Sequence, residues 1–476
     1  MRLAPIAVVV AVLAGAGCAS EKTVSEQRRI AAKLEAGAEA APAGTFSSLS
    51  GLVRHALDRR PSMAAARIEV ADARLAMKEI DSDAPVVSSM PWNAVDAGVS
   101  AGYSESSRAA HSGDFKMKTR KGSVGANLSL DLLVFDFGRH GARRRAQAER
   151  VVAAEQALGR EGFAVCDEVS QAWWNLVQCI ELEKVARTNI VQREAHLEQA
   201  ENRFEAGEAQ RLDVLTARLG VAEAREAAVA ASNDVAVAAV GLGYAAALPA
   251  SAVSVPADAF PAAGAERPAE PSAGGAAAEP QEWGAQPLFD FAATNSPAVL
   301  AAKARVRAAS AQVDYAVADM RPSLSANVSL NWTDPLWYWR WGVDAAQTLF
   351  AGWRKKTAVD RAVAALRKSE TDFDAALQAL RRDIEAAAAE RDNADEAART
   401  ARESLRQARE NLETANAQYE TGDASRVDVA DASATYAAAA AAVVKAACRS
   451  ERARVAICAL AGIEPPFARR QEGEDR

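Results

Sequence analysis

Two carboxylates three residues apart, Asp428 and Asp431, form the residue pair in this sequence that is best suited to chemistry. Residues at this spacing share one face of a helix. If several copies of the chain surround an axis, such pairs form a ring that attracts cations, repels anions and can bind a divalent ion. The alternative is two solvated acids near a helix N-terminus, where the helix dipole favours them.

Catalytic chemistry has no comparable support. The four histidines share no motif, and the sequence contains no evident nucleophile–base arrangement or phosphate-binding loop. The cysteine and histidine spacings fit no zinc site. The net charge of -7, with acids and bases mixed along the chain, argues against a nucleic-acid partner. We therefore expect a protein that is not an enzyme, with no catalytic residues and no metal site.

The aspartate pair belongs to a segment that occurs twice. Residues 203–214 contain an aromatic residue, a glycine and an Asp-Val pair, and residues 418–429 repeat this pattern 215 positions later. The same offset relates residues 135–139 to residues 350–354. An internal repeat of this size indicates one architectural unit that is built twice.

Long helices lead into both copies of this segment. Residues 140–204 and 353–419 contain no proline, and the apolar residues of each show a seven-residue spacing that is typical of coiled coils. A helix of this length is about 100 Å long at 1.5 Å per residue. Gly207 and Gly422 then interrupt the helical pattern, and further helices are predicted at 209–247 and up to residue 461. Each copy therefore predicts a long helical hairpin.

Ahead of each hairpin the apolar pattern changes to strict alternation, which predicts strands with two different faces. Residues 124–132 and 324–332 show it most clearly, with weaker partner strands at 99–103 and 341–349. We expect the polar residues 104–121 to form a loop. Single helical stretches at 49–83 and 288–320 are predicted to precede the strands, with Pro61 at an early kink or a helix start and Pro297 near the start of the second stretch. Four aromatic residues either form an interfacial girdle or pack at the strand–helix junction: Trp337, Tyr338, Trp339 and Trp341.

Cys179 lies 28 residues before Gly207, and Cys448 lies 26 residues after Gly422. Both cysteines therefore stand at similar heights above the hairpin turns. In an oxidising compartment they could form a disulfide. The alternative is that they are small apolar residues in helix seams.

The N-terminus has the basic start and short apolar core of a signal peptide. Small residues precede Cys18, which resembles the lipobox of bacterial lipoproteins and implies that Cys18 carries a lipid. The alternative is an ordinary signal peptide that is cut near Ala19 or Ser20. No other stretch approaches the ~20 apolar residues of a membrane helix, so a membrane crossing would require strands.

The predicted organisation has six parts. These are a signal peptide (1–17), a lipidated segment (18–46), a first repeat (47–248), a Pro/Ala/Gly-rich linker (249–286), a second repeat (287–464) and a charged tail (465–476). The fold class is mainly α with a small β contribution. Four strands cannot cover their own edges in lipid, so several chains would have to combine their strands into one closed barrel.

The motifs at 135–139 (Phe-Asp-Phe-Gly-Arg) and 350–354 (Phe-Ala-Gly-Trp-Arg), together with the two hairpin turns, resemble the TolC-like outer-membrane efflux family over about residues 47–463. The resemblance implies a homotrimer, with a twelve-stranded barrel in the outer membrane of a Gram-negative bacterium and a twelve-helix periplasmic tube. It implies an exit duct for a tripartite efflux pump or a type I secretion system. The implied partners are a periplasmic adaptor (membrane fusion protein), an inner-membrane pump or ABC transporter, and outer-membrane lipid.

The resemblance also assigns residues to roles. It implies a periplasmic gate with an acidic ring at Asp428 and Asp431, and we hypothesise a closing hydrogen bond between the Tyr419 hydroxyl and the Asp213 carboxylate. The residues implied to meet the adaptor are Arg203, Phe204, Gly207, Gly422 and Arg426. A rival from another class is a lipid-anchored periplasmic coiled-coil scaffold. It accounts for Cys18 and the heptads but leaves the alternating segments unexplained.

Overall fold

The computed structural model describes residues 25–26, 28–29, 46, 48–82, 95–109, 116–207, 210–256, 284–333, 336–348, 351–421 and 425–463. For residues 95–125 it describes the backbone alone. The predicted signal peptide, Cys18, Gly422, linker residues 257–283 and the tail at 465–476 lie outside the described residues.

The same four helices occur twice along the chain. The first set is α2 (Leu49–Arg59), α3 (Pro61–Ser82), α4 (Arg139–Glu205) and α5 (Arg211–Ala246), with a short 3-10 helix, η1 (Ala250–Ala252), after α5. The second set is α6 (Ala285–Asn295), α7 (Pro297–Ala318), α8 (Arg354–Thr421) and α9 (Arg426–Ala461). Equivalent helices match closely in length, with 67 residues in α4 and 68 in α8.

The single helices predicted at 49–83 and 288–320 are each two helices, which corrects the sequence-based expectation. Pro61 and Pro297 are the first residues of α3 and α7. The residues before them, Arg60 and Ser296, have ψ angles of 133° and 124°. Because the proline ring disfavours the α conformation of the preceding residue, a helix ends there and another begins.

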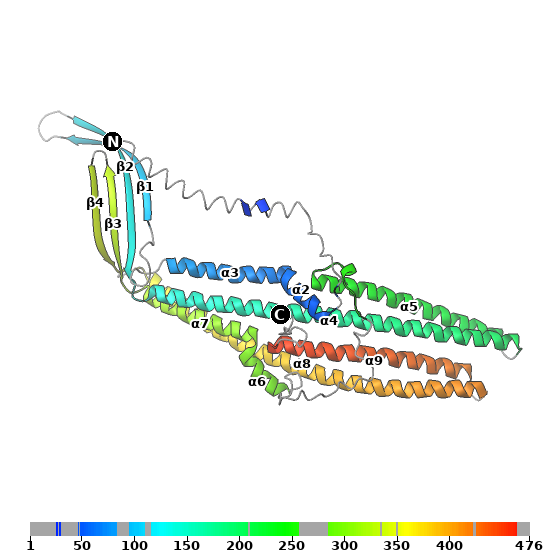
Figure 1. The fold of residues 1–476 in the computed structure, drawn as a ribbon. Helices are drawn as coiled ribbons and strands as arrows, with labels where there is room; N and C mark the ends of the chain where they lie inside the picture. Colours follow the sequence, from blue (N-terminus) through cyan, green and yellow to red (C-terminus); the bar gives the residue numbers. More distant parts are fainter. Residues whose placement is uncertain are drawn as a thin grey trace, which may run out of the picture.

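The helices form a wall that is four helices wide. α4 contacts α3 and α5 on one side and α7 and α9 on the other, and α8 contacts α7 and α9. The order across the wall is therefore α3 with α5, then α4, then α7 with α9, then α8. Figure 1 shows the sheet at one end of the molecule and the tips of the α4–α5 and α8–α9 hairpins at the other. At about 1.5 Å per residue, α4 and α8 are each about 100 Å long.

The four strands form one antiparallel sheet in the order β1-β2-β3-β4, in which β1 and β4 are the edges. The strands are β1 (Val95–Ala109), β2 (Lys116–Phe135), β3 (Ser323–Thr333) and β4 (Leu336–Ala346). The loop predicted at 104–121 is wrong, because Ser104 pairs with Lys121 and the ladder continues to Ala109 and Lys116. Strand pairing uses backbone groups, so a polar segment that lacks an apolar alternation can still continue a ladder.

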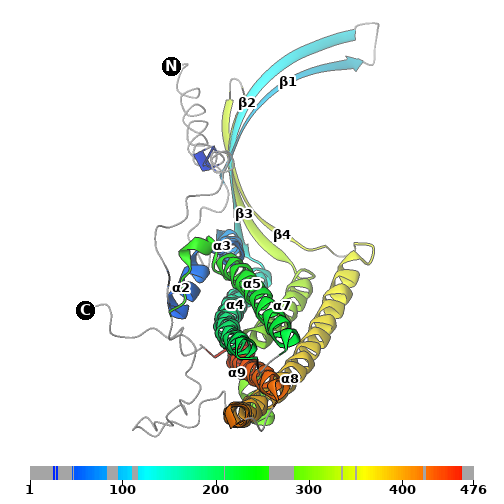
Figure 2. The same cartoon turned by 90° about the vertical axis from the view of Figure 1, so that its right-hand side faces the viewer.

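The first pair of strands is longer than the second. Pairing between β2 and β3 covers Gly125 to Phe135 on β2, whereas β1 pairs with β2 from Lys116 to Leu130. Figure 2 shows β1 and β2 running on beyond the ends of β3 and β4. The far part of this ribbon therefore has two strands rather than four.

Each long helix starts from a sharp turn at the end of a strand. Phe137 and Gly138 have positive φ angles of 53° and 92°, and Gly352 and Trp353, at the matching positions of the second repeat, have 60° and 66°. Asp136, which is buried, accepts hydrogen bonds at the start of α4 from the backbone N–H groups of Gly138, at 3.1 Å, and of His140. The motifs at 135–139 and 350–354 therefore encode the exit from sheet to helix.

Two apolar cores lie beside the long helices. In the first, Leu52 and Val53 of α2 pack with Val169 and Trp173 of α4 and Leu242 of α5. In the second, α6 occupies the equivalent place against α8 and α9. The short helices therefore fasten each hairpin near the base of its second helix.

Of the two alternatives for Cys179 and Cys448, the structure favours small apolar residues in helix seams, since both cysteines are free thiols. Cys448 is buried in the first core and Cys179 packs against that core, so the expected similarity in height is correct. Burial raises the pKa of the Cys448 thiol to about 12. A thiol with such a pKa is a poor nucleophile, so both residues behave as small apolar side chains.

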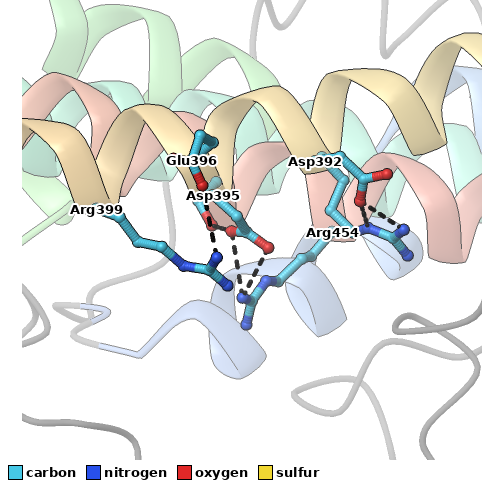
Figure 3. A network of polar contacts seen from close by, with 7 residues as sticks. Asp392, Asp395, Glu396, Arg399 and Arg454 are labelled. Carbon is cyan, nitrogen blue, oxygen red and sulfur yellow. Dashed lines mark hydrogen bonds and ion pairs between the residues drawn. The ribbon is translucent and has the colours of Figure 1, made fainter.

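A polar network joins the two helices of the second hairpin. Asp395 of α8 accepts hydrogen bonds from Ser450 and Arg454 of α9, the latter at 3.4 Å, and neighbouring ion pairs lie along α8 (Figure 3). Arg391, which is buried, donates to Asp392. These contacts add directional bonds to a seam whose apolar residues are mostly alanine.

Two helices, α5 and α9, are long and apolar enough to cross a membrane by length and composition, which differs from the sequence-based expectation. The 18-residue windows concerned have a mean hydropathy of 1.3. Alanine and valine supply this hydropathy, since both segments are rich in them. Because both helices pair along their length with the charged helices α4 and α8, we interpret them as parts of the wall.

Candidate functional site at the hairpin tips

The predicted site residues gather at the ends of the two hairpins. α4 ends at Glu205 and α5 begins at Arg211, while α8 ends at Thr421 and α9 begins at Arg426. Gly207 has a φ of 81°, a conformation that favours glycine, and its N–H bonds to the Phe204 carbonyl at 3.0 Å. Gly422 lies outside the described part of the chain, as does the side chain of Arg426.

Both second helices begin with a capping box. Asp213 accepts a hydrogen bond from the backbone N–H of Gln210 at 3.0 Å. Asp428 accepts one from the backbone N–H of Ser425 at 2.8 Å, and the Ser425 hydroxyl accepts one from the Asp428 N–H at 3.3 Å. The conserved spacing between the two repeats therefore has a structural cause, because each aspartate satisfies a free N–H at a helix start.

The hydrogen bonds from Ser425 also favour the ionised form of the Asp428 carboxyl group. Hydrogen bonds from the Ser425 hydroxyl and backbone N–H lower the pKa of Asp428 below its ordinary value of 3.8. Asp428 and Asp431 are exposed in the first turns of α9. One protomer holds a single pair of these carboxylates, so the acidic ring stays a prediction.

Tyr419 joins three helices. Its ring packs with Leu412 against a small core of Ala415, Val429 and Ala432, between α8 and α9. The guanidinium of Arg203, from the end of α4, lies over the same ring with its central carbon 4.0 Å from the centroid. Arg203 Nη2 also donates to the Tyr419 carbonyl at 3.3 Å. The structure therefore brings Arg203 and Tyr419 together across the two hairpins, which the sequence alone did not predict.

The predicted bond between the Tyr419 hydroxyl and the Asp213 carboxylate stays a prediction. A signal for the Arg203 contact does exist in the sequence. Arg203 precedes the aromatic of the first repeat, whereas the second repeat has Gln418 at that position. Because the second repeat forms its turn without an arginine here, the turn itself does not need the positive charge of Arg203.

Apolar side chains surround the tips. Phe204, Leu212, Leu215 and Val427 are each 45–66% exposed. Exposed apolar groups next to charged ones are typical of a surface that meets another protein. Among the described residues there is no group of three or more histidine, cysteine, aspartate or glutamate side chains that could hold a metal ion.

A groove of about 520 Å³ lies farther up the wall, between α4, α8 and α9. Three of its lining charges form hydrogen bonds across the groove, since Arg449 bonds twice to Glu390 and Arg452 bonds to Gln178 at 2.7 Å. The groove therefore holds wall helices together and presents no nucleophile with an adjacent base.

Comparison with solved structures identifies the fold. A membrane protein from Pseudomonas aeruginosa superposes with a TM-score of 0.70 at 20% identity, covering 89% of this chain and 99% of that one. The outer membrane protein VceC from Vibrio cholerae gives 0.68 at 17% identity, covering 87% and 96%. The Campylobacter jejuni CmeC outer membrane channel gives 0.67 at 16% identity, covering 90% of each chain. No curated protein sequence matches the chain.

The family comparison covers both repeats and leaves out the segment between them. The sequence model described as "Outer membrane efflux protein" matches residues 52–247 and 288–463, which contain the sheet, both hairpins and both tips. The predicted TolC-like resemblance and the outer-membrane location are thereby confirmed. This chain belongs to the outer membrane efflux protein family.

Proposed function

We propose that three copies of this chain close into one channel through the outer membrane, which serves as the exit duct of a tripartite efflux pump. The observation that carries the proposal is a four-stranded sheet with two open edges, β1 and β4, standing on a wall four helices wide. Open edges are prohibitive in lipid, so the edges of neighbouring copies must pair. Three copies give a barrel of twelve strands above a tube of twelve helices.

The surface of α5 supports the same assembly. Seven apolar residues of α5 are 52–79% exposed, namely Leu212, Leu215, Leu219, Val229, Val237, Val240 and Tyr244. At about 100° per residue they fall within an arc of about 100°, opposite the face that packs on α4. α5 lies at one edge of the wall and α8 at the other. We therefore place the α8 helix of a neighbouring copy on this stripe.

The edge strand β4 also fits a lipid boundary. Trp337, Trp339 and Trp341 point to one face of the strand and are 57–70% exposed. Within one protomer they are not buried at the strand–helix junction, which favours the interfacial girdle over the packing alternative. Tryptophan is enriched where a membrane protein meets the headgroup region.

The tips are the proposed point of control. In this proposal an adaptor protein binds Arg203, Phe204, Gly207, Gly422 and Arg426, and the energy for transport comes from an inner-membrane pump. Asp428 and Asp431 of three copies form an acidic ring at the closed end. The Tyr419 hydroxyl and Asp213 help to hold that end shut, so Tyr419→Phe should raise the resting conductance; an unchanged conductance would refute this bond.

We further propose that Cys18 carries a lipid that anchors the N-terminus. Mass spectrometry of the mature protein should find a diacylated N-terminal cysteine at this position. An unmodified peptide that begins at Ala19 or Ser20 would show ordinary signal-peptide cleavage instead.

The assembly and its conduction can be tested together. Purified from outer membranes, the protein should migrate as a heat-modifiable trimer and should form channels in planar bilayers. In cells, its loss should raise the accumulation of a dye or drug, and the wild-type gene should restore export. A monomer that forms no channels would contradict the proposal. A genetic neighbourhood that encodes an ABC transporter with protein cargo would favour a type I secretion duct.

A further inference from the structure

The contact between Arg203 and Tyr419 links the ends of the two hairpins. Arg203 lies two residues before the end of α4, and Tyr419 lies two residues before the end of α8. Another polar link between the hairpins, from Arg452 to Gln178, is 25 residues farther up α4, or about 37 Å along the helix. The Arg203–Tyr419 contact therefore lies far from that link, close to the ends of both hairpins.

The chemistry of the contact suits this position. The guanidinium lies 4.0 Å from the ring centroid and also donates to the carbonyl of the same residue at 3.3 Å. A planar guanidinium can stack on a ring and donate a hydrogen bond from its edge at the same time, which an ammonium group does less well. Both groups are half-buried. Arginine is therefore the residue type that this arrangement requires.

The contact also reaches the helix that carries the acidic pair. Away from Arg203, the Tyr419 ring packs on the core that contains Val429 and Ala432 of α9. Val429 directly follows Asp428 in the sequence, and Ala432 directly follows Asp431. A movement of Arg203 away from the ring would therefore free α8 and α9 together, with their carboxylates.

We propose that Arg203 is a positioning residue that clamps the two hairpin tips of one protomer, and that this clamp must release Tyr419 before the tips separate. The inference rests on the proposed duct function and deepens it, because it names a closing contact inside each protomer. It also gives Arg203, which the family resemblance places on the adaptor-docking surface, a second role in holding the tips together before an adaptor binds.

Hydrogen exchange of the full-length protein in detergent tests the clamp without any need for conduction. We expect Arg203→Ala to raise the exchange rate of amides at residues 412–419, on the other hairpin, by roughly tenfold, which corresponds to about 1.4 kcal/mol of lost coupling. Arg203→Lys should give a smaller rise. Arg218→Ala is the matched control, because Arg218 pairs with Glu201 at 2.8 Å within the first hairpin. It should leave residues 412–419 unchanged.

A double-mutant cycle separates the pair from general loosening. If Arg203 acts through the Tyr419 ring, combining Arg203→Ala with Tyr419→Leu should raise exchange no more than the stronger single variant does. Additive effects, or unchanged exchange in Arg203→Ala, would overturn the clamp.

Conductance then separates the two proposals. Arg203→Ala channels should open about tenfold more often than wild-type channels at rest, in line with the lost coupling. A protein in which no variant conducts, but in which exchange still responds to Arg203, would refute the duct and keep the clamp. If the wild-type protein forms channels and Arg203→Ala leaves their resting conductance unchanged, the clamp has no role in closure, while the proposed duct function stands.

Discussion

At the scale of single residues, two of the aspartates at the hairpin tips have a structural role that is independent of any gate. Asp213 and Asp428 each cap a helix and accept a backbone N–H at its start. Their position six residues after the turn glycine follows from this task, since the box requires an acid at the third helical residue. Asp431 lies three residues beyond the box and has no such task, which makes it the more specific candidate for the acidic ring.

Two substitutions at Asp428 distinguish its role as a helix cap from the effect of its negative charge on ion selectivity. Asp428→Asn keeps an acceptor for the Ser425 N–H but removes the negative charge, whereas Asp428→Ala removes both. We expect both variants to lower the preference for cations in reversal-potential measurements, and Ala alone to speed amide exchange in the first turn of α9. If Asn leaves ion selectivity at the wild-type level, Asp428 does not face the conduction path.

The pH dependence of Asp428 distinguishes an isolated cap from a ring. In one protomer, hydrogen bonds lower its pKa below 3.8, so the cap's stabilisation is complete above pH 3.8 and is lost as the pH falls through the lower folded-state pKa. In a trimer, neighbouring carboxylates would raise the pKa instead. We expect an NMR or exchange titration of the assembled trimer to give a higher midpoint than one of a monomeric variant. Equal midpoints would argue against a ring.

At the scale of elements, equivalent turns in the two repeats solve the same problem with different residues. The turn from strand to helix needs two successive positive φ angles, supplied by Phe137 and Gly138 in one repeat and by Gly352 and Trp353 in the other. One glycine of each pair relieves the strain, while the aromatic tolerates it. The motif could be found in the sequence, but the two positive φ angles that it adopts could not be predicted from it.

Gly462 ends α9 where the chain meets the α6–α7 junction. Its φ is 70°, and an added Cβ would lie 2.9 Å from the Asn295 carbonyl oxygen and 3.0 Å from Pro297 Cδ. We expect Gly462→Ala to destabilise the protein by about 1–3 kcal/mol in denaturant unfolding, because both the backbone and the contact are strained. Gly141→Ala, in α4 with open space around it, should be close to neutral or slightly stabilising. Equal effects of the two changes would contradict this reading.

The sequence predicted the long helices and the hairpin turns well, because unbroken helical periodicity and a glycine are local signals. It failed at 104–121, where a polar stretch continues a strand through backbone pairing. It also did not separate α2 from α3 at Pro61. The contact of Arg203 with Tyr419 and the bonds of Asp395 depend on how helices pack, which local patterns do not record.

At the scale of the whole molecule, one protomer leaves strand edges and helix faces uncovered that the proposed trimer would cover. Its sheet has two open edges and its wall has two open sides, one of which bears the apolar stripe on α5. In α5, one of the two helices apolar enough to cross a membrane, only 17% of the apolar 18-residue window is buried. Such a surface is typical of a protein interface, and in the proposed trimer further copies would bury it.

A charge on the α5 stripe should weaken the trimer selectively. Val229 is 71% exposed on the stripe, whereas Ala227 is exposed on another part of the helix. We expect Val229→Glu to weaken the interface by about 2 kcal/mol or more, through lost apolar burial and a desolvated charge. Ala227→Glu is the control. Native gels over a temperature series should show earlier dissociation for Val229→Glu alone, and equal dissociation would place the interface elsewhere.

The unequal lengths of the two strand pairs have a consequence for the surface of the cell. The outer part of the β1–β2 ribbon pairs only with itself, so in the proposed trimer three such ribbons rise above the rim of the barrel. These are the segments that an antibody or a bacteriophage would meet first. Because they lie beyond the closed ladder, their sequences are free to change under that pressure without disturbing the pore.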